Sequence, residues 1–431
     1  MSNSILDTLN ENQRTAATTI NEHVRIIAGA GSGKTRVLMA RIVYLVQDCG
    51  ILPNRILAIT FTNKAANEMK TRLTAQLGSM ASVVRISTIH SLCVRMLRED
   101  ADLIGYPKTF AIMDPEDQKA ILKPIYKTLE VDKTAISYNR ALGAISAYKT
   151  NYIDPQMAGN MAMDDVSITL AKIYAGYEKR RNEMKAMDFD DLLFYTFLLF
   201  RDHPEVLARY QSQFRYILVD EYQDTNFAQH SIVLQLAKEH QHVCVVGDDA
   251  QSIYSFRGAD IDNILYFTKI YPGTKVFKLE QNYRSTQTIV SAANSLIEKN
   301  QRQIRKEVFS EKERGEAIGV YQAYSDVEEG DIVINKIAEL RRQENYAYSD
   351  FAILYRTNAQ SRVFEEAMRK RSMPYRIYGG LSFYQRKEIK DVIAYFRLTV
   401  NPNDEEAFKR IINYPARGIG DTTVGKITAA A

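Results

Sequence analysis

The hydrophobic pattern of this 431-residue chain alternates between short apolar runs and longer amphipathic stretches. The short runs are rich in β-branched residues, which is typical of strands buried inside a sheet. Strands that alternate with helices in this way predict an α/β fold, in which a parallel sheet is covered by helices. The predicted strands are residues 24–27, 56–60, 83–87, 216–219, 243–246 and 275–279.

The pattern changes between about residues 106 and 187, where helical segments occur without β-branched runs. The first helical segment begins near Asp114-Pro115-Glu116-Asp117, and another runs from Ile168 to Met184. These residues predict a helical subdomain inserted into the α/β domain.

A second change follows Arg284, where residues 287–306 form a long, charge-rich stretch with a helical pattern. Further β-rich runs come after it, so we expect a second α/β domain there. Its predicted strands are residues 318–324, 351–355 and 375–378.

Composition places the chain among soluble proteins of more than one domain, because 45% of its residues are hydrophobic and 25% are charged. It has no run of eighteen apolar residues, and residues 1–8 lack the pattern of a secretion signal. We therefore expect a cytoplasmic protein with no membrane partner. Its three cysteines lack C-x-x-C spacing, which favours reduced thiols. The net charge of +4 permits an anionic partner without specifying one.

The segment Ala28-Gly29-Ala30-Gly31-Ser32-Gly33-Lys34-Thr35 lies between an apolar run and an amphipathic stretch. This spacing predicts a phosphate-binding loop, in which backbone N–H groups surround a polyphosphate. Lys34 would reach the terminal phosphates, and the Thr35 hydroxyl would hold Mg²⁺. Ala28 stands where the strict pattern has glycine. The alternative is a glycine-rich turn that happens to precede Lys-Thr.

An apolar run from Ile217 to Val219 ends in two adjacent carboxylates, Asp220 and Glu221. Downstream of a phosphate loop, this arrangement fits metal-assisted phosphoryl transfer. Asp220 would coordinate Mg²⁺, and Glu221 would orient and deprotonate the attacking water. A solvated strand end is the alternative. A kinase is disfavoured, because it would not need a glutamate that activates water.

A third segment, residues 245–258, is a strand that ends in a polar turn. Gln251, Tyr254 and Arg257 lie three residues apart, a spacing that can place an amide near the γ-phosphate while a ring and a cation face elsewhere. The spacing favours a sensor that links the nucleotide to a second ligand. Taken alone, it fits equally well a capped turn with core aromatics.

With these segments together, the chain resembles the superfamily 1 DNA helicases of the UvrD, Rep and PcrA group. The resemblance covers nearly the whole chain in the family's motif order. It implies a RecA-like P-loop NTPase motor domain with an inserted helical subdomain, followed by part of a second RecA-like domain. The remaining motifs are Leu9-Asn10-Glu11-Asn12-Gln13, Ala58 to Ala66, Thr88 to Ser91, Phe189 to Leu192, Leu279 to Thr286 and Tyr355 to Arg362.

For the nucleotide, the resemblance implies that Gln13 reads the adenine edge and that Arg36 and Tyr283 sandwich the base. Gln251 and Arg284 would meet the γ-phosphate, so that two domains clamp one ATP with its Mg²⁺. The catalytic residues would then be Lys34, Asp220, Glu221, Gln251 and Arg284.

For DNA, the resemblance implies a single strand that crosses both motor domains with its bases stacked on aromatic side chains. Stacking contributes about 1–3 kcal/mol per base and tolerates any sequence. Phe256 stands where relatives often have tryptophan, which this chain lacks, so its stacking surface is smaller. Burial as core is the alternative for the aromatics. The implied DNA-binding residues are Phe61, Thr62, Asn63, His90, Phe189, Tyr254, Phe256, Arg257, Arg356 and Asn358.

The resemblance also divides the chain into domains. The later family motifs, including an arginine-bearing segment that completes the ATP site, are absent from these residues. We therefore expect a monomeric N-terminal fragment that binds ATP and hydrolyses it poorly. The expected parts are 1–105 with 188–278 as the first motor domain, 106–187 as the inserted subdomain, 279–384 as the first part of the second motor domain, and 385–431 as the beginning of a helical accessory domain.

The activity implied for the full-length protein is ATP-driven 3′ to 5′ translocation on single-stranded DNA with duplex unwinding, in DNA repair or replication. Its partners would be single-stranded DNA, single/double-strand junctions, and repair or replication proteins. Basic stretches at 179–181 and 369–371 are candidates for phosphate contacts, with a solvated helix face as the alternative. Two other functions stay open: a motor subunit of a helicase–nuclease complex, and a translocase that strips proteins from DNA without unwinding it.

Overall fold

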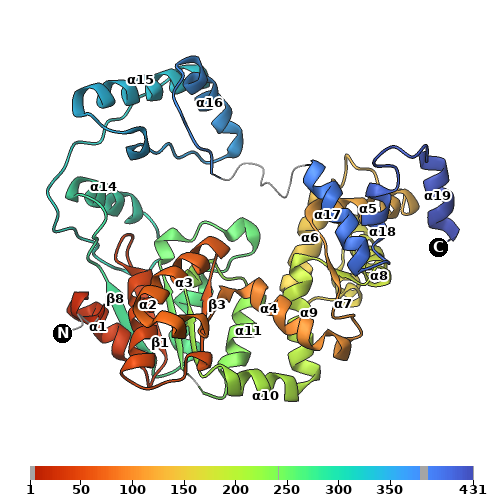
Figure 1. Cartoon of the computed structure of the whole chain (residues 1–431), viewed down its shortest axis with the longest axis horizontal. Helices are drawn as coiled ribbons and strands as arrows, with labels where there is room; N and C mark the ends of the chain where they lie inside the picture. The colour runs from red at the N-terminus through yellow and green to blue at the C-terminus, as the bar shows by residue number, and fades with distance from the viewer. Residues whose placement is uncertain (1–4, 241, 379–386, 431) are drawn as a thin grey trace. The chain divides into compact units, whose positions relative to one another are not determined.

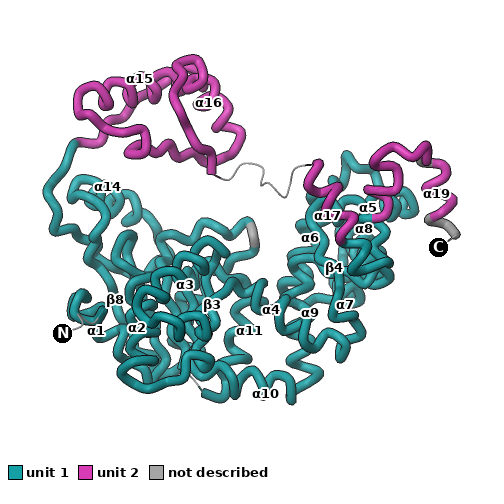
Figure 2. The backbone as a smooth tube through the Cα atoms, in the orientation of Figure 1, with its two compact units in different colours: residues 1–316, 397–407 teal, residues 317–396, 408–431 magenta. Residues whose placement is uncertain are grey.

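The chain forms two compact units in a computed structural model (Figure 1 and Figure 2). Unit 1 contains residues 1–316 and 397–407, and unit 2 contains residues 317–396 and 408–431. No helix in the described part of the chain is long and apolar enough to cross a membrane. The structure describes residues 5–240, 242–378 and 387–430.

Unit 1 is built on a six-stranded parallel sheet that contains all six predicted strands, so the α/β expectation is confirmed. Four of the strands are buried at every position, as parallel strands are when helices cover both faces. Because all the strands point the same way, the loops that follow them meet at one edge of the sheet. In spatial order the strands are β3 (Arg85–Thr88), β2 (Ile56–Thr60), β6 (Tyr216–Val219), β7 (Val243–Gly247), β1 (Val24–Ala28) and β8 (Lys275–Leu279).

Alternate residues of the strands belong to two separate cores, one on each face of the sheet. Ile26 and Ala58 lie in one core, whereas Ile27 and Leu57 lie in the other. The first core is closed by α1 (Glu11–Thr18), α2 (Lys34–Gln47) and α3 (Asn63–Leu77). The second is closed by α4 (Ile89–Asp100), α9 (Phe189–Asp202), α10 (Pro204–Gln213) and α11 (Phe227–Ala237).

The helices expected between residues 106 and 187 are present and share a core of their own. Asp114 caps the first of them, because its side chain accepts hydrogen bonds from two backbone N–H groups of the first turn. The predicted helix at 168–184 begins slightly earlier, after the capping residue Asp164. The elements are β4 (Ala111–Ile112), α5 (Pro115–Thr128), α6 (Tyr138–Thr150), α7 (Pro155–Met161), α8 (Asp165–Glu183) and β5 (Ala186–Met187).

The prediction of one helical stretch over residues 287–306 is wrong beyond Ile297, because α14 (Gln287–Ile297) ends there. The chain then turns back, and the Ile304 N–H donates to the Asp249 carboxylate at 2.8 Å. A side-chain acceptor that captures a backbone N–H competes with helix formation. Residues 280–316 belong to unit 1.

Unit 2 contains helices but none of the predicted strands. Residues 318–324, 351–355 and 375–378 are all described and none of them is in a strand, so these predictions are wrong. A strand needs a hydrogen-bonded neighbour, and local β propensity alone does not provide one. The helices are α15 (Asp326–Glu344), α16 (Ser361–Lys370), α17 (Lys387–Val400), α18 (Glu405–Ile411) and α19 (Asp421–Ala430), of which α17 and α18 cross between the units.

The remaining elements are short helical turns. The expected domain boundary at 384/385 lies outside the described residues. The short elements are η1 (Ile5–Thr8), η2 (Pro53–Arg55), η3 (Gly78–Ser82), η4 (Ala101–Ile104), η5 (Tyr222–Asp224), η6 (Asp249–Gln251), η7 (Ser255–Arg257), α12 (Asp262–Leu265), α13 (Phe267–Ile270), η8 (Tyr348–Asp350) and η9 (Asn358–Gln360).

Candidate functional site

The predicted phosphate loop connects β1 to the first residue of α2. Gly31 and Gly33 have positive φ angles of 67° and 83°, which favour glycine. No side chain caps α2, so its first backbone N–H groups point into the loop without that partner. Ser32 is buried, and its hydroxyl has no hydrogen-bond partner among the described residues. These uncapped donors suit a polyphosphate.

The two carboxylates after β6 lie next to the loop. Glu221 Oε2 is 2.9 Å from Lys34 Nζ. Asp220 is buried beside the Thr35 hydroxyl, which hydrogen-bonds to it. Burial, followed by the negative charge of Glu221, raises the pKa of Asp220 to about 6. The Asp220 carboxylate and the Thr35 hydroxyl supply the oxygen ligands that Mg²⁺ prefers. A bound cation would also compensate the negative charge that burial disfavours.

The γ-phosphate candidate Gln251 ends η6 in the loop after β7. Its side-chain Nε2 donates to Asp248 Oδ2 at 2.7 Å. Asp248 is itself buried and follows β7 directly. The structure thus places Gln251 at the same sheet edge as Lys34 and Glu221, and holds its amide by a carboxylate.

The residues expected at the adenine are brought together in part. Gln13 Nε2 donates to the Ser32 carbonyl at 2.8 Å, and Gln13 Oε1 accepts the Asn10 N–H, so this amide fixes the loop to α1. Asn10 Nδ2 donates to the Tyr283 hydroxyl at 2.8 Å. Arg36 is exposed on the first turn of α2. The roles of Gln13, Arg36 and Tyr283 toward the base stay predictions.

Asn282, a residue with no role among the sequence predictions, ties Arg284 to the phosphate loop. Asn282 Nδ2 donates to the Ala30 carbonyl at 2.7 Å, and Asn282 Oδ1 accepts the Arg284 N–H at 2.8 Å. A Cβ at Gly31 would lie 2.8 Å from the Arg284 Cβ. The sequence could have indicated this role of Asn282, because asparagine often stabilises a turn by accepting the backbone N–H two residues later.

Three of the expected DNA-binding aromatics form one group. The ring centroids of Phe61 and Tyr254 lie 4.9 Å apart, and those of Tyr254 and Phe256 lie 5.9 Å apart. Phe256 is 64% exposed. The alternative of a buried core therefore does not apply to Phe256.

His90 and Phe189 form a second aromatic pair, with ring centroids 5.9 Å apart in an edge-on arrangement. Phe189 is the first residue of α9 and is 55% exposed. Burial lowers the pKa of His90 to about 4, so the ring is neutral at pH 7. We therefore expect His90 to meet DNA as a neutral group.

A cavity of about 310 Å³ joins the hydrolytic side to the aromatic side of unit 1. Asp220 and Glu221 line it together with Phe61, His90 and Tyr254. Thr62 also lines the cavity and caps α3 by accepting the N–H of Ala65.

The other predicted DNA residues are placed less completely. Asn63 begins α3, and its Oδ1 accepts the Ser91 hydroxyl at 3.4 Å. Arg257 lies in η7. Arg356 and Asn358 are exposed in unit 2, just before α16. Their roles stay predictions.

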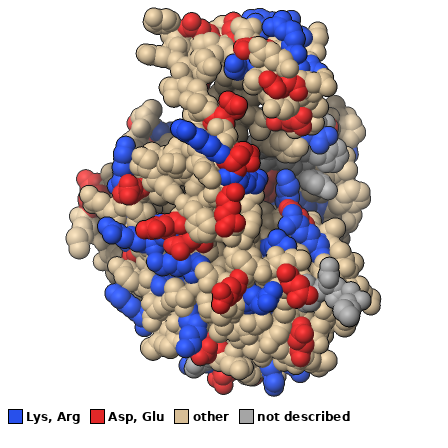
Figure 3. Space-filling model, turned by 90° about the vertical axis from the view of Figure 1, so that its left-hand side faces the viewer, with Lys and Arg blue, Asp and Glu red and all other residues tan. Residues whose placement is uncertain are grey.

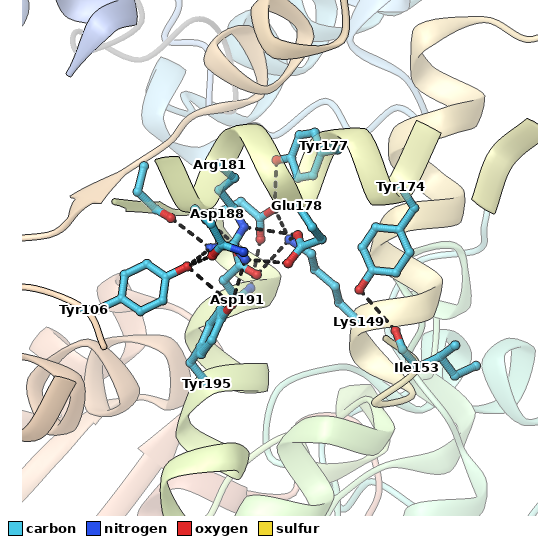
Figure 4. A network of polar contacts seen from close by, with 12 residues as sticks. Tyr106, Lys149, Ile153, Tyr174, Tyr177, Glu178, Arg181, Asp188, Asp191 and Tyr195 are labelled. Atoms are coloured by element: carbon cyan, nitrogen blue, oxygen red, sulfur yellow. Dashed lines mark hydrogen bonds and ion pairs between the residues drawn. The ribbon is translucent and has the colours of Figure 1, made fainter. Parts of the chain in front are cut away.

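Phe189 is presented by a buried ionic network at the start of α9 (Figure 4). Lys149 Nζ from α6 lies 2.7 Å from both Asp188 Oδ2 and Asp191 Oδ1, and 2.8 Å from Glu178 Oε1. Arg181 pairs with Asp191 at 3.0 Å. Since Asp188 also caps α9, the network fixes the helix that carries Phe189 to the inserted helices.

This network corrects one sequence hypothesis. Arg181 was a candidate for phosphate contacts, but it is completely buried, so that hypothesis is wrong for this residue. Arg180 pairs with Glu183 and Glu405. On the face shown in Figure 3, basic and acidic side chains are interspersed, so this face offers no field of a single sign.

Comparison with known families matches the chain over almost its entire length. A model described as the UvrD/REP helicase N-terminal domain matches residues 9–272, and one described as the UvrD-like helicase C-terminal domain matches residues 277–431. The chain is 47% identical over 425 residues to the ATP-dependent DNA helicase PcrA of Staphylococcus aureus strain Mu50, covering 99% of this chain and 58% of that protein. It is 46% identical over 429 residues to the ATP-dependent DNA helicase PcrA of Staphylococcus epidermidis strain RP62A, covering 59% of it. The chain thus spans less than two thirds of the length of these relatives.

Proposed function

Since the chain belongs to the UvrD/REP helicase family, we propose that it carries the ATP-binding site and part of the DNA-binding surface of an ATP-dependent DNA helicase. The observation that supports this most directly is the shared cavity, in which Asp220 and Glu221 lie with Phe61 and Tyr254. An enzyme that couples hydrolysis to movement along single-stranded DNA needs its hydrolytic and DNA-binding residues close enough to influence one another.

At the nucleotide, we propose that Lys34 leaves Glu221 and meets the terminal phosphates. Glu221, no longer neutralised, is then free to accept a proton from the attacking water. Thr35 and Asp220 would hold Mg²⁺, which supplies charge neutralisation at the phosphate oxygens. Gln251 and Arg284 would contact the γ-phosphate, where charge develops during transfer.

On single-stranded DNA, the bases would stack on Phe61, Tyr254 and Phe256. Phe189 and His90 would contact further nucleotides of the same DNA strand. Stacking suits an enzyme that moves over any sequence, because every base has an aromatic face. Tyr254 follows Gln251 by three residues in one loop. We propose that this loop transmits the presence of the γ-phosphate to the grip on the strand.

The finer parts of the proposal follow the family resemblance. They are 3′ to 5′ movement, duplex unwinding, a role in DNA repair or replication with the corresponding partners, and a cytoplasmic location. Residues 1–431 alone are expected to bind ATP but to hydrolyse it more slowly than a protein of the relatives' length. Comparing DNA-stimulated turnover of the two proteins tests this point, and equal rates would contradict it.

The central experiment compares nucleotide binding, strand binding and unwinding. Titration with Mg-ATP and with fluorescent single-stranded DNA should give saturable binding of both by residues 1–431. With a protein of the relatives' length, a duplex with a 3′ single-stranded tail should be unwound and one with a 5′ tail should not. A protein that displaces bound streptavidin but separates neither duplex would instead be a translocase without unwinding activity.

A further inference from the structure

Residues 304–310 follow α14 and return toward the loop that carries Gln251, the residue proposed to contact the γ-phosphate. Lys306 holds this segment against that loop. Lys306 Nζ lies 2.9 Å from Asp248 Oδ1 and 2.7 Å from Asp249 Oδ1. Its side chain is only 6% exposed. A buried cation between two buried carboxylates is costly to leave unpaired, so this contact is firmly specified. The proposed mechanism above gives Lys306 no role.

Asp248 is the centre of the contact, because each of its polar groups has a different partner. Asp248 Oδ1 pairs with Lys306, and Asp248 Oδ2 accepts Gln251 Nε2 at 2.7 Å. The Asp248 N–H donates to Gln223 Oε1 at 3.0 Å. Gln223 Nε2 in turn donates to Glu221 Oε2 at 2.8 Å. A continuous chain of contacts therefore runs from Lys306 to both Gln251 and Glu221.

The packing around these contacts is close. A Cβ at Gly247 would lie 2.4 Å from Gln223 Oε1, so a side chain at position 247 would displace the Gln223 amide. The returning segment also meets the phosphate loop, because a Cβ at Gly29 would lie 2.6 Å from Val308 Cγ2. The same segment thus packs against the loop that would hold the phosphates and contacts Asp248, the carboxylate that holds the Gln251 amide.

We propose that Lys306 is a positioning residue for Gln251, acting through Asp248. This inference rests on the proposed function, because it assumes that Gln251 meets a γ-phosphate. With Lys306 present, Asp248 is charge-compensated and holds the Gln251 amide by a hydrogen bond that a γ-phosphate oxygen can replace. Without Lys306, an uncompensated Asp248 binds the amide more strongly and the buried carboxylates repel one another, so Gln251 no longer responds to the phosphate.

The absence of tryptophan from the chain allows a clean reporter of this loop. Ile253 is 62% exposed and follows Gln251 by two residues, so Ile253→Trp places one fluorophore beside the sensor. In that background, Lys306→Met removes the cation and Lys306→Arg keeps it. Lys299→Met makes the same change at an exposed lysine of the same stretch and serves as the matched control.

Each variant is titrated, with Mg²⁺, against a non-hydrolysable ATP analogue and against ADP. In the parent, Lys306→Arg and Lys299→Met, the analogue should shift the emission while ADP should not. In Lys306→Met both nucleotides should still bind within about threefold of the parent, but the emission should no longer distinguish them. Retention of the difference in Lys306→Met would overturn the inference, as would an equal loss of both affinities.

Lys306→Met combined with Asp248→Asn removes both charges together and keeps the assignment testable if the single variant does not fold. Because asparagine carries no uncompensated charge at position 248, the double variant should bind both nucleotides and recover at least part of the emission difference. A folded double variant that binds both nucleotides with no recovery would also overturn the inference. A parent that binds neither nucleotide would refute the proposed function instead, so the two failures are distinguishable.

Discussion

Lys34 Nζ and Glu221 Oε2 lie 2.9 Å apart, so the cation expected at the phosphates and the base expected at the water neutralise each other. Gln223 Nε2 donates to the same Glu221 oxygen at 2.8 Å. A phosphate that attracts Lys34 would therefore free Glu221 from its cation while Gln223 still orients the carboxylate. In the proposed mechanism, this contact would link phosphate binding to activation of the base.

Lys34→Ala tests the phosphate contact directly. A hydrogen bond to a charged group contributes about 1.5–3 kcal/mol, so Mg-ATP affinity should fall about 10- to 150-fold. Isothermal titration calorimetry measures the change. Lys70→Ala, at an exposed position of α3, is the control and should leave the affinity unchanged. Parent-like affinity in Lys34→Ala would show that the loop does not bind the nucleotide.

Glu221→Gln separates binding from chemistry. The amide keeps the size of the side chain but cannot take a proton, so hydrolysis should fall by about 10²- to 10⁴-fold. Mg-ATP affinity should be equal to that of the parent or higher, because Lys34 is no longer held by an opposite charge. Turnover is measured in a protein of the relatives' length with saturating single-stranded DNA. Unchanged turnover would remove Glu221 from the catalytic residues.

Phe61→Ala tests the stacking assignment. Loss of one stacked base should weaken binding of single-stranded DNA by about 1–3 kcal/mol, or about 5- to 150-fold, and leave Mg-ATP binding intact. Fluorescence anisotropy with a labelled oligonucleotide reports the change. Tyr266→Ala removes a ring that is more exposed than Phe61 and lies elsewhere in unit 1, and it is the control. If both variants bind DNA like the parent, the aromatic group has another role.

The elements that the sequence predicted well are those whose signal is local. Four strands of unit 1 are mostly apolar and buried at every position, so their pattern can be recognised without knowledge of their neighbours. The phosphate loop could also be predicted from the sequence, because its local turn requires positive φ angles at Gly31 and Gly33, which glycine adopts readily. The predicted catalytic residues Lys34, Asp220 and Glu221 lie close together because the loops that follow the parallel strands β1 and β6 meet at one edge of the sheet.

The elements that failed depend on distant partners. Tyr324 is 97% exposed in a range predicted as a strand, because β propensity does not supply a neighbouring strand. Arg181 was indistinguishable from a solvated arginine until three-dimensional packing placed it beside Asp191. Lys306 meets Asp248 across more than fifty residues of sequence, so no spacing rule could have shown the pair.

His90 should make stability depend on pH in a defined direction. Burial lowers its pKa to about 4 from 6.5, so the unfolded chain binds a proton at higher pH than the folded chain. Its contribution to stability is complete above about pH 6.5 and is lost as pH falls toward 4. His90→Gln should therefore lose less stability than the parent between pH 6.5 and 4.5, as measured by calorimetry.

Part of this pH dependence should persist in His90→Gln, because burial also lowers the pKa of His230 to about 4. The combination of His90→Gln with His230→Gln should be flatter than either single variant. Parallel curves for the parent and the double variant between pH 6.5 and 4.5 would contradict the assignment.

Lys149→Met should strongly destabilise the inserted helices and the start of α9. It leaves Glu178, Asp188 and Asp191 buried with Arg181 as the remaining cation of the network, and removing one partner of a buried ion pair costs about 3–5 kcal/mol. Urea unfolding followed by circular dichroism measures the loss. Lys172→Met, at an exposed position of α8, should stay within about 0.5 kcal/mol of the parent.

Adding Asp188→Asn to Lys149→Met distinguishes charge from packing. Because the second change removes one of the uncompensated carboxylates, the double variant should recover part of the lost stability. Asparagine still offers an oxygen that caps α9, and the recovery should be incomplete because the contacts of Lys149 with Glu178 and Asp191 are still lost. If the double variant is instead less stable than Lys149→Met, the side chain of Lys149 contributes through its packing, and charge compensation is not what holds Phe189 in place.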